Sequence, residues 1–350
     1  MARSLVIDET EITEDSDCYV VAELGCNHMG SVDTAKEMIR FASFCKVNAV
    51  KLQKRDNRAL FTRQMFDSPY INRNSFGETY GTHREALELD RDAYVELIAC
   101  AKEHNVTLFA TPFDFPSVDF LADLDMPAYK TASGDITNTP LLKYVAEIGK
   151  PMMVSTGGAT MEDVERAHDA IVPINSQLCI MQCTSSYPAA ADELNLKVIE
   201  TYRERFGDIV VGLSDHQNGI AMAMLAFMLG ARMIEKHFTI NRAWKGTDQA
   251  FSLEPAGMGR LVRDLQRARV ALGDGVKQMF PDEKEPLHKM RKKLVAAKDV
   301  PTGQILSRED LTIKAPGDGL APYYLDEVIG MTATRPLAVD DDIKLEYLRK

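Results

Sequence analysis

The chain has 350 residues, of which 45% are hydrophobic and 27% are charged, and its formal net charge is -11 at pH 7. This acidic excess excludes a chain-wide basic surface, so nucleic acids and anionic membranes are not expected as partners. No apolar stretch approaches the roughly 20 residues of a membrane helix, and residues 1–17 lack a signal-type apolar core, so we expect a soluble, cytoplasmic protein.

Short apolar runs alternate eight times with longer amphipathic or polar stretches. The runs cover residues 19–24, 49–53, 107–111, 128–132, 151–155, 178–182, 209–213 and 233–237. Helix-start signals stand between them, such as Thr139 before Pro140 and Thr160 three residues before Asp163. This repeated strand-then-helix order predicts a parallel sheet covered by helices, and eight such units close most economically into a (β/α)8 TIM barrel over residues 1–273.

Three segments depart from the simple repeat. Residues 54–88 are longer and more polar than a structural loop needs, and we expect them over the barrel mouth. After a helical pattern at 254–272, residues 274–293 indicate a linker. Residues 294–350 form a β-rich block, with apolar runs at 294–297, 303–306 and 343–345 and one that begins at Leu311. A block this small is a marginal core, so we expect it to pack against the barrel of its own chain or of a partner.

Polar side chains cluster at the C-terminal ends of the predicted strands, where TIM barrels build their active sites. They are Glu23, Lys51, Gln53, Thr111, Lys130, Ser133, Ser155, Thr184, Ser214, His216, Glu235 and His237. His216 and His237 end two consecutive runs, so we expect both at the same rim as candidate ligands of one metal ion. The alternative for each is a core histidine that is bonded to backbone groups.

Seven ordered segments together resemble the sialic acid synthase family. They are Ala22-Glu-Leu-Gly-Cys-Asn-His-Met-Gly-Ser31, Val50-Lys-Leu-Gln53, Tyr129-Lys-Thr-Ala-Ser-Gly-Asp135, Ser155-Thr-Gly157, Gln182-Cys-Thr-Ser-Ser-Tyr-Pro188, Gly212-Leu-Ser-Asp-His216 and Glu235-Lys-His-Phe-Thr239. The resemblance runs from about residue 18 to the C-terminus. There, residues 294–350 resemble the family's antifreeze-like SAF domain, which has a β-clip fold.

The resemblance implies a condensation of phosphoenolpyruvate (PEP) with an N-acylated hexosamine. We expect N-acetylmannosamine as the sugar, and N-acetylneuraminate (sialic acid) and phosphate as the products. A divalent metal, Mn²⁺ in first place with Mg²⁺ or Co²⁺ as alternatives, would be held by His216 and His237 and would polarise the aldehyde of the open-chain sugar. The resemblance also implies a domain-swapped homodimer, in which each SAF domain covers the partner's barrel mouth.

PEP carries a phosphate and a carboxylate, so an acidic protein needs converging donors to hold it. Lys51 and Lys130 interrupt apolar strand patterns, where an unpaired lysine would be costly to bury, and we predict that both bind PEP. The matched family positions add hydroxyl or backbone donors, although each serine alone also fits a turn at a strand end. These PEP-binding candidates are Thr111, Ser133, Ser155 and Ser214.

The catalytic candidates are Glu23, Lys51 and Glu235. The resemblance implies that Glu23 organises the outer shell of the metal or moves a proton as water adds to PEP. Its alternative is a buried ion pair with a lysine. Glu235 precedes His237 by two residues and faces the same way along a strand, so it either supports the metal site or belongs to the core.

For the sugar, Gln53, Asp135, Tyr187 and Asp248 match family positions that contact the hexosamine. Three departures from many bacterial members put the pocket in question. Asp135 and Ser185 stand in place of glutamate and asparagine. Ala315 stands in place of an arginine that reaches toward the N-acyl group in a partner's site.

Other segments, Gln182-Cys-Thr-Ser185 and Trp244-Lys-Gly-Thr-Asp-Gln-Ala-Phe-Ser-Leu-Glu-Pro255, resemble the animal-type synthases, which use the sugar 6-phosphate and release a 9-phosphate. Loop cations are candidates to receive that phosphate, or are simply a solvated charged face: Lys54, Arg55, Arg63, Arg73, Arg84 and Lys245. We place the free sugar first. Mannose or a diacetamido-hexose leading to legionaminic or pseudaminic acid remains an alternative, as does a non-catalytic ice- or sugar-binding protein.

Overall fold

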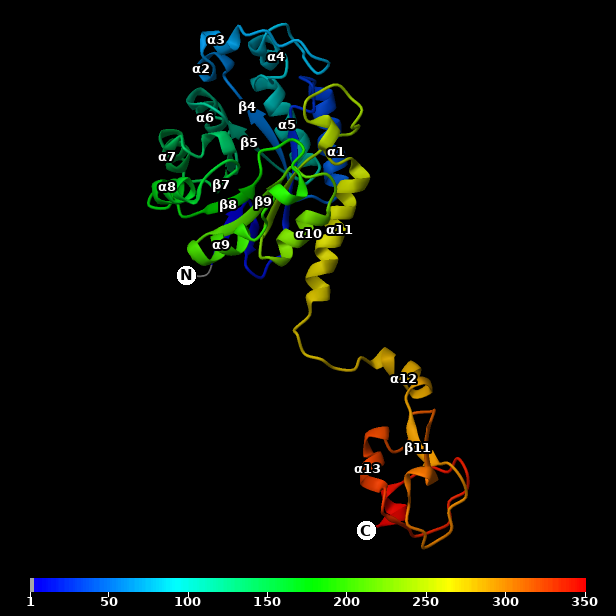
Figure 1. Ribbon diagram of the computed structural model, residues 1–350. Helices are drawn as coiled ribbons and strands as arrows, with labels where there is room; N and C mark the ends of the chain where they lie inside the picture. The colour runs from blue at the N-terminus through cyan, green and yellow to red at the C-terminus, as the bar shows by residue number, and fades with distance from the viewer. Residues whose placement is uncertain (1–2) are drawn as a thin grey trace. The chain divides into compact units, whose positions relative to one another are not determined.

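The computed structural model describes residues 3–350. The chain divides into two compact units, the first ending at Leu272 and the second beginning at Gly273. In the first unit, a closed barrel of parallel strands is surrounded by helices (Figure 1). Its strands are β3 (Tyr19–Gly25), β4 (Ala49–Lys54), β5 (Thr107–Pro112), β6 (Tyr129–Thr131), β7 (Met152–Ser155), β8 (Leu178–Cys183), β9 (Val210–Asp215) and β10 (Met233–His237). Pairing of β10 with β3 closes the ring, which confirms the predicted TIM barrel.

The helices that cover the barrel follow the strands in the expected order. They are α1 (Val32–Phe44), α5 (Arg91–Glu103), α6 (Phe115–Ala122), α7 (Thr139–Glu147), α8 (Met161–Ile171), α9 (Val198–Arg205), α10 (Ala221–Met228) and α11 (Pro255–Leu272). Thr160 and Asp163 form a reciprocal capping box that satisfies backbone donors at the start of α8, as their spacing predicts. The outward side chains of the strands pack against these helices in the main hydrophobic cluster.

The barrel interior changes from apolar to polar along the strands. Val21, Phe109 and Met233 belong to an apolar cluster inside the barrel. Two residues further along the same strands stand Glu23, Thr111 and Glu235, which line a pocket. Because side chains at i and i+2 face the same side of a strand, each strand presents an apolar group below and a polar group above. The polar layer lies toward the C-terminal strand ends.

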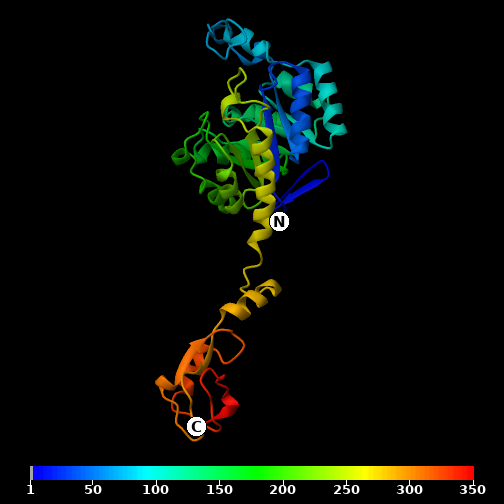
Figure 2. The same cartoon turned by 90° about the vertical axis from the view of Figure 1, so that its right-hand side faces the viewer.

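A hairpin of β1 (Ser4–Ile7) and β2 (Thr10–Thr13) precedes the barrel. Leu5, Ile7 and Ile12 are buried in the same apolar cluster as the barrel interior, so the hairpin closes the barrel at its N-terminal end. Figure 2 shows the dark blue hairpin and the light blue insertion at opposite ends of the barrel. The sequence analysis did not predict this hairpin.

The insertion at 54–88 is built of short helices rather than of an open loop. They are α2 (Asn57–Leu60), α3 (Arg63–Phe66) and α4 (Tyr80–Glu85). His83 is buried among aromatic rings of the insertion, with Tyr70 at 4.6 Å between ring centroids. The side chains of Leu60, Phe61, Tyr80 and Arg84 reach the pocket at the polar end of the barrel, where we expected this segment.

The second unit begins with α12 (Lys284–Met290), so the predicted linker includes a helix. Its strands form two antiparallel pairs, β11 (Lys293–Ala296) with β12 (Leu311–Lys314), and β13 (Thr332–Ala333) with β14 (Leu348–Arg349), and it also contains α13 (Leu325–Val328). The runs at 303–306 and 343–345 are not strands, although backbone hydrogen bonds such as Gly303 N–H to the Ala333 carbonyl and Ile343 N–H to the Leu294 carbonyl tie them to their neighbours. A small apolar core lies between these segments.

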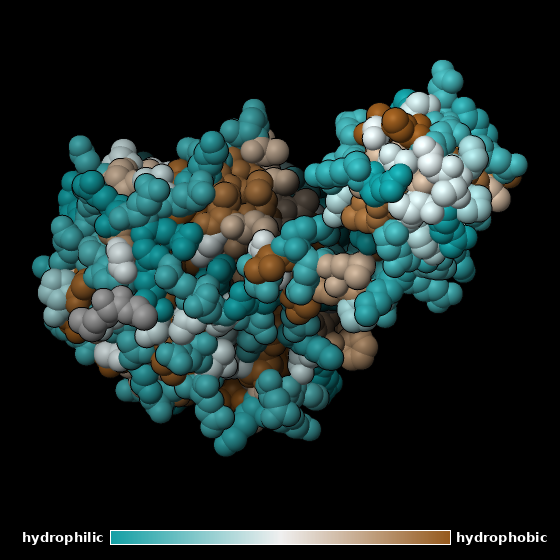
Figure 3. All heavy atoms as spheres, turned by 90° about the horizontal axis from the view of Figure 1, so that it is seen from below, coloured by the Kyte–Doolittle hydropathy of each residue, from teal (hydrophilic) through white to brown (hydrophobic). Residues whose placement is uncertain are grey.

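Most of the visible surface is polar. Hydrophilic residues cover most of the face shown in Figure 3, and apolar groups form smaller patches between them. Within residues 3–350, every helix is too short or too polar to cross a bilayer.

The apolar layer inside the barrel should dominate the stability of the first unit. Phe109 is fully buried there, so we expect Phe109→Ala to lower the free energy of unfolding by about 3–5 kcal/mol. The matched control is Phe44→Ala on α1, because Phe44 is 84% exposed and should change it by less than about 0.5 kcal/mol. Urea titration followed by the fluorescence of Trp244 measures both. Equal losses of unfolding free energy in Phe109→Ala and Phe44→Ala would contradict this assignment of the core.

Candidate functional site

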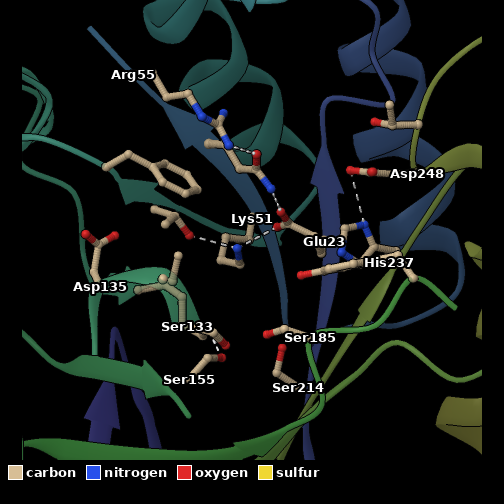
Figure 4. Close-up of a pocket in the computed structure, with 18 of the residues that line it drawn as sticks. Glu23, Lys51, Arg55, Ser133, Asp135, Ser155, Ser185, Ser214, His237 and Asp248 are labelled. Atoms are coloured by element: carbon tan, nitrogen blue, oxygen red, sulfur yellow. Dashed lines mark hydrogen bonds and ion pairs between the residues drawn. The ribbon is translucent and has the colours of Figure 1, made fainter. Parts of the chain in front are cut away.

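A pocket opens at the C-terminal ends of the barrel strands (Figure 4). The predicted catalytic, PEP-binding, sugar-binding and metal-binding residues all line this pocket: Glu23, Lys51, Gln53, Thr111, Lys130, Ser133, Asp135, Ser155, Tyr187, Ser214, His216, Glu235, His237 and Asp248. Of the strand-end polar residues, Thr184 does not line it, and its hydroxyl donates to the Glu193 carbonyl oxygen. Seven of the eight barrel strands contribute residues to the pocket, and β8 contributes Ser185 and Tyr187 through the loop that follows it, as strand-end placement predicts.

Lys51 lies at the centre of a buried charge cluster. Its Nζ is 2.8 Å from Glu23 Oε2 and 3.6 Å from Glu235 Oε1, and it donates to Thr111 Oγ1 at 2.8 Å. Burial works against the charged lysine, but the adjacent carboxylates, Glu23 foremost, raise the pKa of Lys51 above its usual value. The ion pair that we considered as the alternative for Glu23 is thus present, and it lies inside the pocket.

The two carboxyls of the cluster differ in their electrostatic surroundings. Burial raises the pKa of Glu23 above its usual value, which suits a group that takes up and releases a proton. Burial acts on Glu235 in the same direction, but the charges of Lys130 and Lys51 outweigh it and lower the pKa of Glu235. Glu235 is therefore the more firmly ionised of the two.

Lys130 is the second buried cation, on β6. Its Nζ donates to the Ser155 hydroxyl and to the Thr131 carbonyl oxygen, the latter at 3.2 Å. Burial lowers the pKa of Lys130, because neither partner carries a charge. An anion beside Lys130 would therefore be strongly attracted.

Small polar groups complete this side of the pocket. Ser133 Oγ accepts from the backbone N–H of Gly157 at 3.0 Å and donates to Cys183 Sγ at 3.4 Å. Ser214 Oγ lies 3.5 Å from Glu235 Oε1. The predicted hydroxyl groups therefore surround the two lysines, as an anion site requires.

The two histidines lie side by side, with ring centroids 5.3 Å apart. His216 Nδ1 is 2.9 Å from the Thr184 carbonyl oxygen, which only accepts, so Nδ1 carries the proton and the Nε2 lone pair is free. Burial lowers the pKa of His237 to about 3, so its ring is neutral at physiological pH. Its Nδ1 is buried without a hydrogen-bond partner among residues 3–350, and the nearest carboxylate oxygen, Asp248 Oδ2, is 3.8 Å away.

Burial works against a charged His216 ring, but Cys183 and the Thr184 carbonyl outweigh it and raise the pKa of His216. The neutral His237 ring and the deprotonated form of His216 fit a metal ion that keeps positions open for water and substrate. No group of three or more histidine, cysteine, aspartate or glutamate side chains within residues 3–350 is arranged to hold a metal. A metal at this place would thus have the two histidines as its protein ligands.

The predicted sugar-binding residues ring the opening. Asp135 lies on a 3₁₀ turn (Ser133–Asp135) after β6, and burial raises its pKa. The Tyr187 ring lies 4.3 Å from the His216 ring between centroids. Figure 4 shows Asp135 and Asp248 on opposite sides of the Glu23–Lys51 pair. A ligand between these two aspartates would lie over the buried cluster.

The structure adds pocket residues that sequence reasoning missed or treated only as loop charges. Arg55 and Arg84 line the pocket, as do the aromatic rings of Phe61, Tyr80 and Phe113. The sequence feature that could have identified Arg55 as a pocket residue was its position directly after a strand. The other loop cations lie elsewhere: Lys54 pairs with Glu88, Arg73 and Lys245 line a neighbouring hollow, and Arg63 is exposed.

The charges around the pocket cancel. Its cationic side chains are Lys51, Arg55, Arg84 and Lys130, and its carboxyl groups are Glu23, Asp135, Glu235 and Asp248. An anionic ligand that is buried here would therefore leave an excess of negative charge unless a further cation accompanies it.

Comparison with known proteins identifies the chain. A model of the NeuB family matches residues 38–277, and a model of the SAF domain matches residues 291–345. The chain belongs to the NeuB family. The resemblance stated from the sequence motifs is confirmed.

Named relatives of this NeuB family chain are synthases. Human N-acetylneuraminate-9-phosphate synthase is 37% identical over 333 residues, which cover 95% of this chain and 92% of the human protein. The N,N'-diacetyllegionaminic acid synthase of Campylobacter jejuni is 35% identical over 329 residues, which cover 93% of this chain and 98% of that protein. This family member is therefore an enzyme of the synthase class, and the alternative of a non-catalytic binding protein is set aside.

A solved structure supports the same fold. N-acetylneuraminic acid synthetase from Leptospira borgpetersenii, in complex with citrate, superimposes with a TM-score of 0.71 at 30% identity. The match covers 82% of this chain and 96% of that protein.

The buried cluster gives a pH-dependent prediction for Lys51→Met. Without Lys51, burial holds the pKa of Glu23 above its unfolded value, so stability is present at low pH and is lost as pH rises. We expect a loss of about 3–5 kcal/mol at pH 8 and a smaller loss at pH 5, each against wild type in urea titrations. The double variant Lys51→Met/Glu23→Gln should remove this pH dependence. If Lys51→Met lost the same free energy of unfolding at both pH values, the assignment of Lys51 as the charge partner of Glu23 would be contradicted.

Proposed function

We propose that this protein condenses PEP with the open-chain form of an N-acylated hexosamine, N-acetylmannosamine in first place, to give N-acetylneuraminate and phosphate. The observation that carries the proposal is that one pocket brings two buried lysines, two adjacent histidines and a carboxyl of raised pKa together. Family membership and synthase relatives over nearly the whole chain support the reaction class.

PEP would bind at the lysine side of the pocket. Lys130 lacks a charged partner within hydrogen-bond distance, and Ser155 and Thr111 supply hydroxyl groups beside Lys130 and Lys51. Ser133 and Ser214 border the same space. Together these groups offer the donors that a phosphate and a carboxylate require.

In the reaction, the PEP methylene carbon attacks the sugar aldehyde carbon, and the new carbon–carbon bond leaves an alkoxide that takes up a proton. Water adds to the second carbon of PEP and the carbon–oxygen bond to phosphate breaks, which gives the 2-keto acid and inorganic phosphate. Glu23, whose pKa is raised by burial, pairs with Lys51 and accepts from Gln53, and it is placed to accept the proton of that water. Glu235 stays ionised, and its charge partly offsets the burial that lowers the pKa of Lys130.

His216 and His237 would hold the divalent metal, for which Mn²⁺ remains the first expectation. Bound there, a metal would supply Lewis-acid polarisation of the aldehyde oxygen and the positive charge that the balanced pocket lacks. The Thr184 carbonyl fixes the tautomer of His216 that leaves Nε2 free. The domain-swapped homodimer and the cytoplasmic location likewise remain proposals.

A second candidate substrate is the 6-phosphate of the same sugar, with a 9-phosphate as product. A hollow beside the pocket is lined by three cations, Arg73, Arg242 and Lys245, and shares Tyr187 and Thr247 with the pocket wall. A sugar bound near His216 could extend its terminal phosphate into this hollow. The human relative, named for a 9-phosphate product, supports this candidate.

Metal removal tests the ligand assignment. Dialysis against EDTA should abolish phosphate release from PEP and N-acetylmannosamine, and added Mn²⁺ should restore it. His237→Ala should stay inactive with Mn²⁺ but still unfold in one cooperative transition, at a Tm lowered by about a few degrees because the ring no longer packs against Phe251. Full activity after stripping, or full activity of the variant, would contradict the assignment.

The two sugars can be told apart by kcat/KM. We expect turnover of N-acetylmannosamine to be insensitive to Lys245→Met. If the 6-phosphate is the true substrate, its kcat/KM exceeds that of the free sugar, and Lys245→Met lowers it by about 10-fold, as loss of a charge-assisted hydrogen bond does. Equal loss with both sugars would mean that Lys245 does not contact a phosphate.

A further inference from the structure

Arg55 occupies an unusual position for a charged side chain. It directly follows β4, is only 7% exposed, and lines the pocket. Its guanidinium carbon lies 3.8 Å from the centroid of the Phe113 ring, which follows the neighbouring strand β5. The side chain is therefore held in one place by stacking, which favours a defined role.

Its ion pair does not account for this placement. The nearest carboxylate oxygen, Glu88 Oε1, is 3.9 Å from Nη1. Glu88 is already engaged by Lys54 Nζ and by the backbone N–H of Arg55, both at 3.2 Å. The short contact of the guanidinium is a different one, from Nη2 to Gln53 Oε1 at 2.6 Å.

This contact determines which way the Gln53 amide faces. A guanidinium only donates, so the group next to it must be the amide oxygen. The amide nitrogen of Gln53 then faces the other way and donates to Glu23 Oε1 at 2.6 Å, while Lys51 occupies Oε2 of the same carboxylate at 2.8 Å. The hydrogen bonds thus run in one direction from Arg55 through Gln53 to Glu23 (Figure 4).

We propose that Arg55 is a positioning residue, which fixes the Gln53 amide so that its nitrogen serves Glu23 and leaves one N–H for an acceptor on the sugar. Without Arg55 the amide oxygen keeps only the weak contact from Cys26 Sγ at 3.7 Å, so the amide is held almost entirely by its bond to Glu23 and is no longer fixed at both ends. The part that concerns the sugar rests on the proposed function. The part that concerns the amide does not.

The kinetic test compares Arg55→Met with Arg55→Lys, with PEP and the sugar varied separately. Lysine also only donates, so it should keep the orientation. We expect Arg55→Met to lower kcat/KM for the sugar by about 10- to 100-fold while KM for PEP changes by less than about 2-fold, and Arg55→Lys to recover to within about 5-fold of wild type. The matched control is Arg91→Met on α5, an exposed arginine outside the pocket, which should equal wild type. The proposal would be overturned if Arg55→Met changed the KM of PEP as much as the KM of the sugar, or if Arg55→Lys failed to restore activity.

A second readout does not depend on turnover. In [¹⁵N]glutamine-labelled protein, the side-chain amide signals of Gln53, identified by their loss in Gln53→Met, should shift in Arg55→Met and remain near wild type in Arg55→Lys. Unmoved signals in Arg55→Met would overturn the proposal. If wild type turns over no sugar, the proposed function fails, and the amide signals still decide the role of Arg55.

Discussion

Lys51 lies between two carboxylates, 2.8 Å from Glu23 and 3.6 Å from Glu235, and almost no water reaches the three groups. Buried charges are tolerated only when they are paired, so these groups stay at the barrel mouth because the barrel brings them together. Closure makes β10 and β4 the two neighbours of β3, and the register sets Glu23 beside both Lys51 and His237. A shift of one residue would turn these side chains toward the helices.

The same pairing limits what the pocket can bind unaided. Four cationic and four acidic side chains line it, so it attracts a multiply charged anion only if further positive charge arrives with that anion. Two adjacent histidines at the rim, His216 and His237, offer ring nitrogens for such a cation. In this account, the metal ion and PEP each favour the binding of the other, because each supplies the charge that the other needs.

The sequence was sufficient for the barrel and for the members of the pocket, because alternation of strands and helices and polar residues at strand ends are local patterns. It was insufficient for the hairpin that closes the barrel floor, since Leu5, Ile7 and Ile12 acquire their role only through contact with a cluster that is assembled from distant strands. It also misjudged Arg55, which was treated as one of many loop charges. Only the fold shows that Phe113 and Gln53 flank this arginine. The two short runs in the second unit did not form strands: 303–306 makes a single isolated bridge, at Ile305, and 343–345 leads into a 3₁₀ turn.

The central claim is that the pocket forms a carbon–carbon bond between PEP and a sugar aldehyde, and ¹³C NMR with PEP labelled at its methylene carbon tests it most directly. In the presence of Mn²⁺ and N-acetylmannosamine or its 6-phosphate, the account predicts that the labelled signal moves from the vinyl region to that of a saturated methylene in a nine-carbon acid. A label that remains in PEP, or that appears only as the methyl carbon of pyruvate, would contradict the account, because phosphate would then be lost without condensation.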